Sequence, residues 1–194
     1  MTIAGKIEST IAIPDGVSVT LDGGIMKVKG PRGELSRNFA HPGIDIAVGE
    51  GVVSVSCEYP RIRDKAMVGT YLAHVRNMIR GVTVGYVYTL KIVFNHFPMK
   101  VAVKGDRVEI NNYMGGHAPR YANILKGCTV KINGTDVTVE GNDIEAVGQT
   151  AANLEKATSR LGFDKTATIS AFTTLKGATR LSTSETMSLL AHST

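Results

Sequence analysis

The chain has 194 residues, of which 43% are hydrophobic and 20% charged, and it carries a net charge of +5. This composition excludes wholesale disorder, and the length leaves room for two domains of roughly 80 to 100 residues. The positive charge favours a polyanionic partner. The longest apolar run, Val82–Phe94, is interrupted by Lys91 and is too short to span a bilayer. Because Lys6 and Glu8 break the N-terminal apolar stretch, we expect no signal peptide and no membrane contact, and hence a soluble cytoplasmic protein.

Strands and tight turns are predicted for the first 60 or so residues. Val17–Leu21 and Ile25–Lys29 alternate apolar and polar side chains, and Asp22–Gly24 between them can adopt the positive φ values of a tight hairpin. The turn Gly30–Gly33 should leave Arg32 at its tip. Further short strands are predicted at residues 34–38, 44–48 and 52–59.

An amphipathic helix is predicted from Asp64 to Arg80. Four apolar side chains recur on one face and form its expected buried stripe: Val68, Leu72, Val75 and Ile79. Asp64 can cap the start, and Gly81 can end the helix in the left-handed conformation. The extended run Val82–Phe94 then either pairs into the first sheet or links the two halves.

The second half repeats this order, since Ile13–Thr20 and Phe97–Lys104 begin alike about 84 residues apart. Hairpins are predicted around Gly105-Asp106 and Asn133-Gly134. A second helix is predicted from Asn142 until Gly162 stops it. Its expected buried face consists of Ile144, Val147, Ala151, Leu154 and Leu161.

These patterns predict an α+β fold of two duplicated domains, each a mostly antiparallel sheet with one helix packed on one face. We assign residues 1–83 to the first repeat, 84–165 to the second repeat and 166–194 to a C-terminal tail. Thirteen of the last 29 residues are Ser or Thr, so a loosely structured tail is expected. Ser182–Glu185 could start one short helix within it.

No catalytic or metal-binding pattern stands out. The five histidines are not spaced as metal ligands, and the two cysteines, Cys57 and Cys128, form no CxxC pair. Cys57 is expected to pack as a small apolar side chain in a reducing compartment. Neither a Walker loop nor a nucleophile elbow occurs. We therefore expect no enzyme activity, no cofactor, no metal and no small-molecule substrate.

Two alternatives to polyanion binding stay open at this point. A small enzyme with a cleft between its lobes would need a deep pocket that groups a histidine with a carboxylate. A protein–protein adaptor would use the sheet edges or the apolar residues Met187, Leu189 and Leu190, and its binding would be insensitive to salt.

The segment Asn111–Tyr121 is the first candidate site for a polyanion. Its glycines allow backbone N–H groups to approach phosphates, and Arg120 can contact a phosphate through two N–H groups. Tyr113 or Tyr121 can stack on a base or lie on a sugar. An ordinary long loop closed by its own tyrosines is the competing interpretation. We predict that Arg120→Ala weakens RNA binding with little change in stability.

A run of cations in the last third of the chain is the second candidate site: Lys156, Arg160, Lys165, Lys176 and Arg180. Asp164 is the only acid among them. Lys156 and Arg160 also complement the dipole at the end of the second helix, which is a structural explanation for those two residues. In the first half, Arg32 and the Arg61–Lys65 segment are weaker candidates, and a solvated charged face explains the latter better.

Four segments together resemble one family, the universal large-ribosomal-subunit protein L-six in its archaeal and eukaryotic branch, called L-nine in eukaryotes. These segments are Gly30–Leu35, Asn77–Tyr86, Asn111–Arg120 and Val147–Thr158, and the resemblance extends from about Ile11 to about Asp164. The most specific of them is Asn77–Tyr86. The sequence departs from the family at Gly116 and His117, where an acid and a base are usual, and after Lys165.

The resemblance implies the same duplicated α+β fold and a structural role in the large ribosomal subunit. It also implies binding to large-subunit rRNA, mainly through the second domain, beside the docking site of translational GTPases, with neighbouring large-subunit ribosomal proteins as further partners. By position, Asn111, Gly115, Pro119 and Arg120 match the family's loop, and Lys156 and Arg160 lie on its second helix. We expect these residues, together with Tyr113 and His117 of the same loop, to bind RNA. Lys165, Lys176 and Arg180 are added on charge alone.

Overall fold

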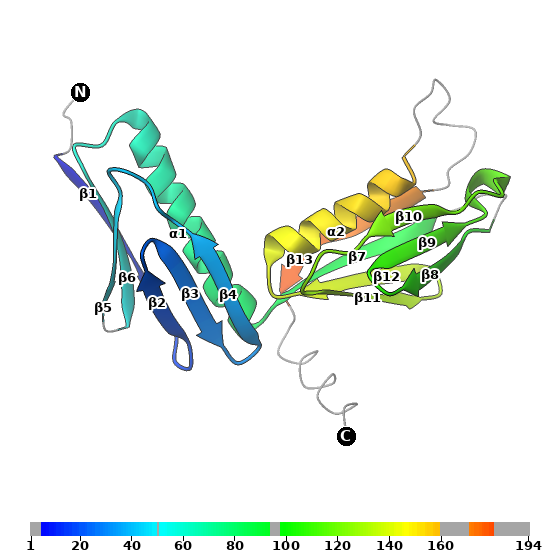
Figure 1. Ribbon diagram of the computed structural model, residues 1–194, viewed down its shortest axis with the longest axis horizontal. Helices are drawn as coiled ribbons and strands as arrows, with labels where there is room; N and C mark the ends of the chain where they lie inside the picture. Colours follow the sequence, from blue (N-terminus) through cyan, green and yellow to red (C-terminus); the bar gives the residue numbers. More distant parts are fainter. Residues whose placement is uncertain (1–4, 50, 94–97, 160–170, 181–194) are drawn as a thin grey trace. The chain divides into compact units, whose positions relative to one another are not determined.

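The computed structural model describes residues 5–49, 51–93, 98–159 and 171–180, and for the last of these ranges the backbone only. The chain forms two compact units, Met1–Val84 and Gly85–Thr194. Figure 1 labels their helices and strands. Each unit carries two antiparallel sheets and one long helix, so the predicted class, duplicated α+β domains, is confirmed.

The first unit contains two three-stranded sheets and helix α1 (Ile62–Thr83). One sheet has the order β1 (Lys6–Ala12), β6 (Val52–Glu58), β5 (Asp45–Gly49). The other has the order β2 (Ser18–Asp22), β3 (Ile25–Gly30), β4 (Gly33–Asn38). Gly23 and Gly24, with φ of 56° and 88°, close the predicted hairpin between β2 and β3. Helix α1 packs on β1, β3 and β6, and Met26, Val55 and Val75 are fully buried in the core of this unit.

Helix α1 differs from its prediction at both ends. Its first cap is Arg61, whose backbone N–H donates to the Asp64 carboxylate at 2.9 Å, so Asp64 stabilises the start from inside the first turn. The helix also passes through Gly81 and ends at Thr83. Gly81 and Val82 are buried, and burial of this last turn extends the helix beyond the glycine expected to stop it. Tyr71 is buried where Leu72 was expected, and Leu72 is half-buried.

The second unit repeats this plan with one strand more. One sheet has the order β11 (Cys128–Asn133), β12 (Asp136–Gly141), β7 (Tyr86–Val93), β13 (Ala171–Arg180). The other has the order β10 (Arg120–Asn123), β9 (Arg107–Asn111), β8 (Lys100–Lys104). A short 3-10 helix, η1 (Tyr113–Gly115), lies between β9 and β10, and helix α2 (Ile144–Ala157) lies between β12 and β13. Leu90, Val139 and Leu154 are fully buried in the core of this unit.

Two expectations about strands are wrong. Tyr86–Val93 neither joins the first sheet nor acts as a linker, because it pairs with β12 and β13 in the second unit. Ala171–Arg180 is not a loose tail: it forms β13, and threonine is a good strand residue despite its polarity. Helix α2 ends at Ala157, with Thr158 as its C-cap, so the prediction that it continues to Gly162 is wrong. Leu161, Gly162 and the short helix expected from Ser182 lie outside the described residues.

Candidate nucleic-acid interface

The loop between β9 and β10 has a fixed, tightly turned backbone. Asn112 and Met114 adopt positive φ angles of 59° and 53°, which are uncommon outside glycine, and Gly115 follows at 75°. The Asn112 side chain donates to the Pro98 carbonyl oxygen at 3.1 Å, and the Gly116 N–H donates to the Tyr113 carbonyl oxygen at 3.0 Å. Residues 116–120 are exposed beyond these anchors. Hydrogen bonds thus anchor the first half of the loop, and its second half is exposed to solvent.

Tyr113 belongs to the support of this loop. Only 7% of the residue is exposed, and its hydroxyl donates to the Thr158 carbonyl oxygen at 2.7 Å. This bond gives a partner to a carbonyl just beyond the end of α2, where helical partners run out. The prediction that Tyr113 stacks on a base does not fit this burial, because the ring has no open face.

Arg120 also connects this loop to the C-terminal end of α2. Its Nη1 donates to the Ala157 carbonyl oxygen at 2.8 Å, and its Cζ lies 4.0 Å from the centroid of the Tyr113 ring. A cation at the last carbonyls of a helix complements the helix dipole, and a guanidinium over an aromatic ring gains a cation–π contact. These contacts argue against the expectation that Arg120→Ala changes stability little, although Arg120 as a residue is exposed.

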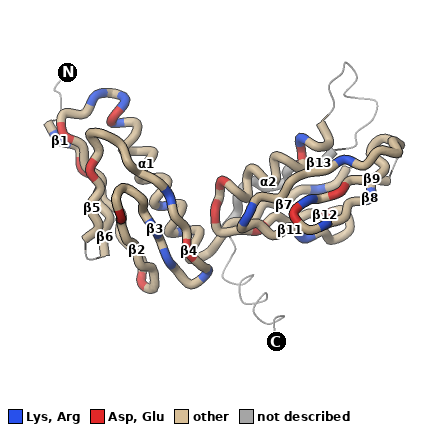
Figure 2. Tube along the Cα trace, viewed as in Figure 1, with Lys and Arg blue, Asp and Glu red and all other residues tan. Residues whose placement is uncertain are grey.

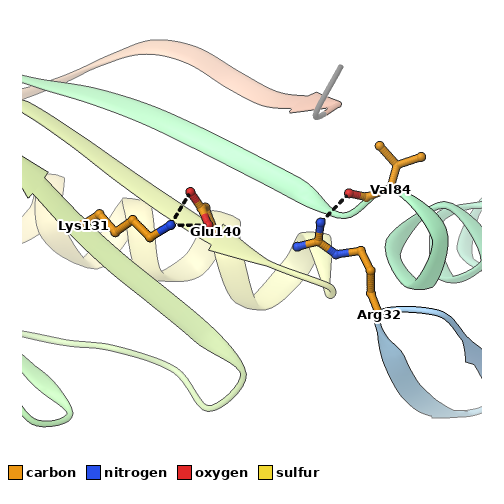
Figure 3. A network of polar contacts seen from close by, with 4 residues as sticks. All are labelled: Arg32, Val84, Lys131 and Glu140. Carbon is orange, nitrogen blue, oxygen red and sulfur yellow. Dashed lines mark hydrogen bonds and ion pairs between the residues drawn. The ribbon is translucent and has the colours of Figure 1, made fainter. Parts of the chain in front are cut away.

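An arginine also donates to a carbonyl at the end of the helix in the first unit. Arg32, in the turn between β3 and β4, donates from Nη1 to the Val84 carbonyl oxygen at 3.0 Å, as Figure 3 shows, and its N–H donates to the Val82 carbonyl oxygen at 3.1 Å. Val84 caps the C-terminal end of α1. The dipeptides Pro31-Arg32 and Pro119-Arg120 thus occupy corresponding places in the two repeats. Arg32 lies in the turn as predicted, but its guanidinium binds protein.

The structure brings some of the predicted residues together. Gly115, His117, Pro119 and Arg120 share the β9–β10 loop, and the contacts of Arg120 join this loop to the last turn of α2, where Lys156 is exposed. Asn111 ends β9 and Tyr113 begins η1. We call the exposed loop residues 116–120 together with Lys156 the loop–helix corner. Figure 2 colours the lysines and arginines of the described residues blue and the acids red.

The remaining predicted residues are placed only in part. Lys176 and Arg180 lie on β13, where they pair with Thr89 and Tyr86 of β7. Arg160 and Lys165 lie outside the described residues. Not every cation of this unit is available to a polyanion: the Lys131 ammonium lies 3.3 and 3.2 Å from the two carboxylate oxygens of Glu140, as drawn in Figure 3.

The described residues offer no arrangement suited to catalysis. Among them, no group of three or more His, Cys, Asp or Glu side chains could hold a metal ion. An open hollow of about 450 Å³ in the first unit contains His41, but its other lining residues are apolar or glycine and include no carboxylate. Cys57 is 2% exposed in the core, and burial raises the pKa of its thiol, which confirms its expected packing role. No helix in the described part could cross a membrane.

Sequence reasoning missed the groups that hold the loop–helix corner. Those groups are the carbonyl oxygens of Ala157 and Thr158, which accept from Arg120 and Tyr113. Backbone carbonyls carry no sequence signal of their own. The recurrence of Pro-Arg at residues 31–32 and 119–120 is the signal that could have found them, because a dipeptide kept in both repeats points to a shared structural task.

Comparison with known proteins supports the family resemblance over both repeats. The model of the Ribosomal protein L6 family matches residues 13–85 and 97–164. Among similar curated proteins, one from Ignicoccus hospitalis is 49% identical over 170 residues, covering 85% of this chain and 91% of that protein. Others from Methanospirillum hungatei and Methanobrevibacter smithii are each 47% identical, over 78% and 84% of this chain and 86% and 92% of their own lengths. All three are named large ribosomal subunit protein uL6. The chain therefore belongs to the ribosomal protein L6 family.

Proposed function

We propose that this protein is a structural, non-enzymatic component of the large ribosomal subunit that binds large-subunit rRNA mainly through its second unit. The observation that carries this proposal is the family match over both repeats, at close to half identity with proteins named for the large subunit. The fold supports it, because both units present exposed loops, and the described residues include no group of three or more His, Cys, Asp or Glu side chains that could hold a metal ion.

Binding relies on charge and shape. Lys156 and the exposed part of Arg120 neutralise phosphates, which supplies affinity without reading sequence. His117 and Pro119 project from the held loop and fix register against an RNA surface of defined shape. We also propose RNA contacts for Lys176 and Arg180 on β13, and for Arg160 and Lys165, which lie outside the described residues. Neighbouring large-subunit proteins are further partners, in a cytoplasmic ribosome.

The proposed location is beside the docking region of translational GTPases, and a tethered cleavage reagent tests it. A cysteine introduced as His117→Cys, in a chain whose own cysteines are replaced by serine or alanine, carries an iron–EDTA group into assembled large subunits. Cuts in large-subunit rRNA confined to the GTPase docking region are expected. Cuts elsewhere would refute the location, and failure of the tagged chain to sediment with large subunits would refute the function itself.

A further inference from the structure

The three-stranded sheet β10-β9-β8 has one face in the core and one open face. Val108, Ile110 and Ala122 point inward and are at most 3% exposed. Because side chains alternate along a strand, their neighbours point to the opposite face. Those outward residues are Lys100, Ala102 and Lys104 on β8, Arg107, Glu109 and Asn111 on β9, and Tyr121 and Asn123 on β10.

The one acid on this open face is already neutralised. Glu109 is 8% exposed, and its carboxylate forms an ion pair with Lys104. The hydrogen bond from Lys104 is the main reason that the pKa of this carboxyl lies below its ordinary value. Lys100 and Arg107 are exposed, and they face Asn111 and Lys104 across the strands. The open face is therefore left with uncompensated positive charge.

Pairs within the sheet do not balance this charge, since Glu109 can offset only one of the three cations Lys100, Lys104 and Arg107. Lys104 and Arg107 lie directly opposite each other on β8 and β9, and like charges in that position destabilise a sheet. The first repeat provides a comparison, because the corresponding sheet β2-β3-β4 balances its cations. There Lys27 lies 3.4 Å from the Asp22 carboxylate, and Lys29 faces Glu34 across the strands.

Tyr121 adds an aromatic ring to the charged face. It is 55% exposed and lies opposite Glu109, in the row of residues beside the two cations. Strands β2, β3 and β4 of the first repeat contain no aromatic residue. An exposed ring on a cationic sheet suits unpaired nucleotides, whose bases stack on aromatic side chains while their phosphates meet lysine and arginine.

We propose that the open face of β10-β9-β8 is a second RNA-binding surface, on which Tyr121 stacks on an unpaired base and Lys100 and Arg107 hold the adjoining phosphates. The proposal rests on the proposed function and assigns it a surface separate from the exposed loop–helix corner. It predicts that the rRNA bound here has at least one unstacked nucleotide.

Binding of the full chain to large-subunit rRNA across a salt series tests this surface. Tyr121→Ala should weaken binding by about five-fold or more, whereas Tyr121→Phe, which keeps a ring, should bind as the parent does. Lys100→Gln with Arg107→Gln should lower the slope of log K against log salt by about 1.5, for two lost phosphate contacts. The matched control on the first repeat, Lys27→Gln with Lys29→Gln, should leave the slope unchanged.

Ultraviolet crosslinking of the unaltered protein in large subunits keeps the test independent of any folding defect. A crosslinked peptide that contains Tyr121 joined to a nucleotide is expected. If the parent binds rRNA but the open-face variants match it in affinity and slope, the second surface is refuted while the proposed function stands. Tyr121 crosslinked to a protein instead would also refute it, and absence of rRNA binding by the parent would overturn both proposals.

Discussion

Arg120→Ala should destabilise the second unit, because this side chain joins the β9–β10 loop to the end of α2. The substitution removes the 2.8 Å hydrogen bond to the Ala157 carbonyl oxygen and the contact of Cζ with the Tyr113 ring at 4.0 Å. A hydrogen bond from a charged donor contributes about 1.5 to 3 kcal/mol, but Arg120 is exposed, so the lower part of this range applies. An exposed cation–π contact adds about 0.5 to 1 kcal/mol. We expect a total loss of about 2 kcal/mol.

Hydrogen exchange measured on the full chain locates this loss. Amides in the last turns of α2 should exchange faster in Arg120→Ala, while amides of α1 in the first unit should not change. Urea unfolding should show the midpoint of the second unit lowered with its slope unchanged. Lys156→Ala is the matched control: it removes one cation from the same helix end, where Lys156 is exposed, and should cost no more than about 0.5 kcal/mol.

Two results would contradict the proposed structural role of Arg120 in joining the β9–β10 loop to α2. Unchanged exchange of α2 in Arg120→Ala, together with weaker rRNA binding, would make Arg120 solely an RNA contact. Equal destabilisation by Lys156→Ala would mean that loss of charge near the helix end, rather than the specific bond to Ala157, causes the effect.

Three further outcomes are expected. Gly30→Ala should destabilise the first unit by about 1 to 3 kcal/mol, because a Cβ there would lie 2.9 Å from the Val82 carbonyl oxygen. Gly69→Ala, at an exposed helix position with open space around it, should instead stabilise α1 by about 0.5 to 1 kcal/mol. Thermal melts in which both variants shift in the same direction would contradict this. Tyr113→Phe should cost about 1 to 2 kcal/mol in urea unfolding, since it leaves the Thr158 carbonyl oxygen without the buried hydroxyl, and a neutral effect would argue against that bond. The pKa of Glu109 is lowered mainly by its hydrogen bond from Lys104, so the pair stabilises the fold at pH values above the ordinary carboxyl pKa of 4.5 and loses this contribution as pH falls through the lowered pKa of the folded protein. Glu109→Gln should therefore lose less stability than the parent on acidification, and identical acid unfolding curves would show that the pair contributes nothing.

Much of the fold could be predicted because local patterns agree with it. The hairpins at Gly23-Gly24 and Asn133-Gly134 combine alternating strands with residues that accept positive φ. Strand β1 was missed because its half-buried residues include Ser9 between Ile7 and Ile11, which breaks the apolar alternation. Strand β13 was missed because its place depends on β7, and composition alone made it look like a polar tail.

The candidate site was predicted less well, for a physical reason. A sequence shows that Arg120 is cationic and lies in a glycine-containing loop, but not that the carbonyl of Ala157 comes within hydrogen-bond distance. Tyr113 was misjudged in the same way, since burial decides whether a tyrosine stacks on a base or supports a loop. Lys156 lies in the last turn of α2, as predicted, because the helix itself follows from the local apolar period.

The division of the chain at Val84 and Gly85 also affects experiments. Dividing the chain after β7, at the end of the run Val82–Phe94, would leave the second-unit fragment without β7, which lies between β12 and β13 in its sheet. A test of the second unit's contribution to RNA binding therefore needs the full chain with substitutions, because such a fragment lacks a central strand.

The most direct measurement is binding of the full chain to large-subunit rRNA across a salt series, with matched charge-loss variants of the two units. The second-unit variant carries Lys100→Ala and Lys156→Ala, one cation from each proposed surface, and the first-unit variant carries Arg63→Ala and Arg76→Ala, so each variant loses two cations at exposed positions. We predict tight, steeply salt-dependent binding that weakens clearly only in the second-unit variant. Salt-insensitive or absent binding, or equal weakening by the first-unit variant, would contradict the claim that the second unit is the main rRNA-binding part of this protein.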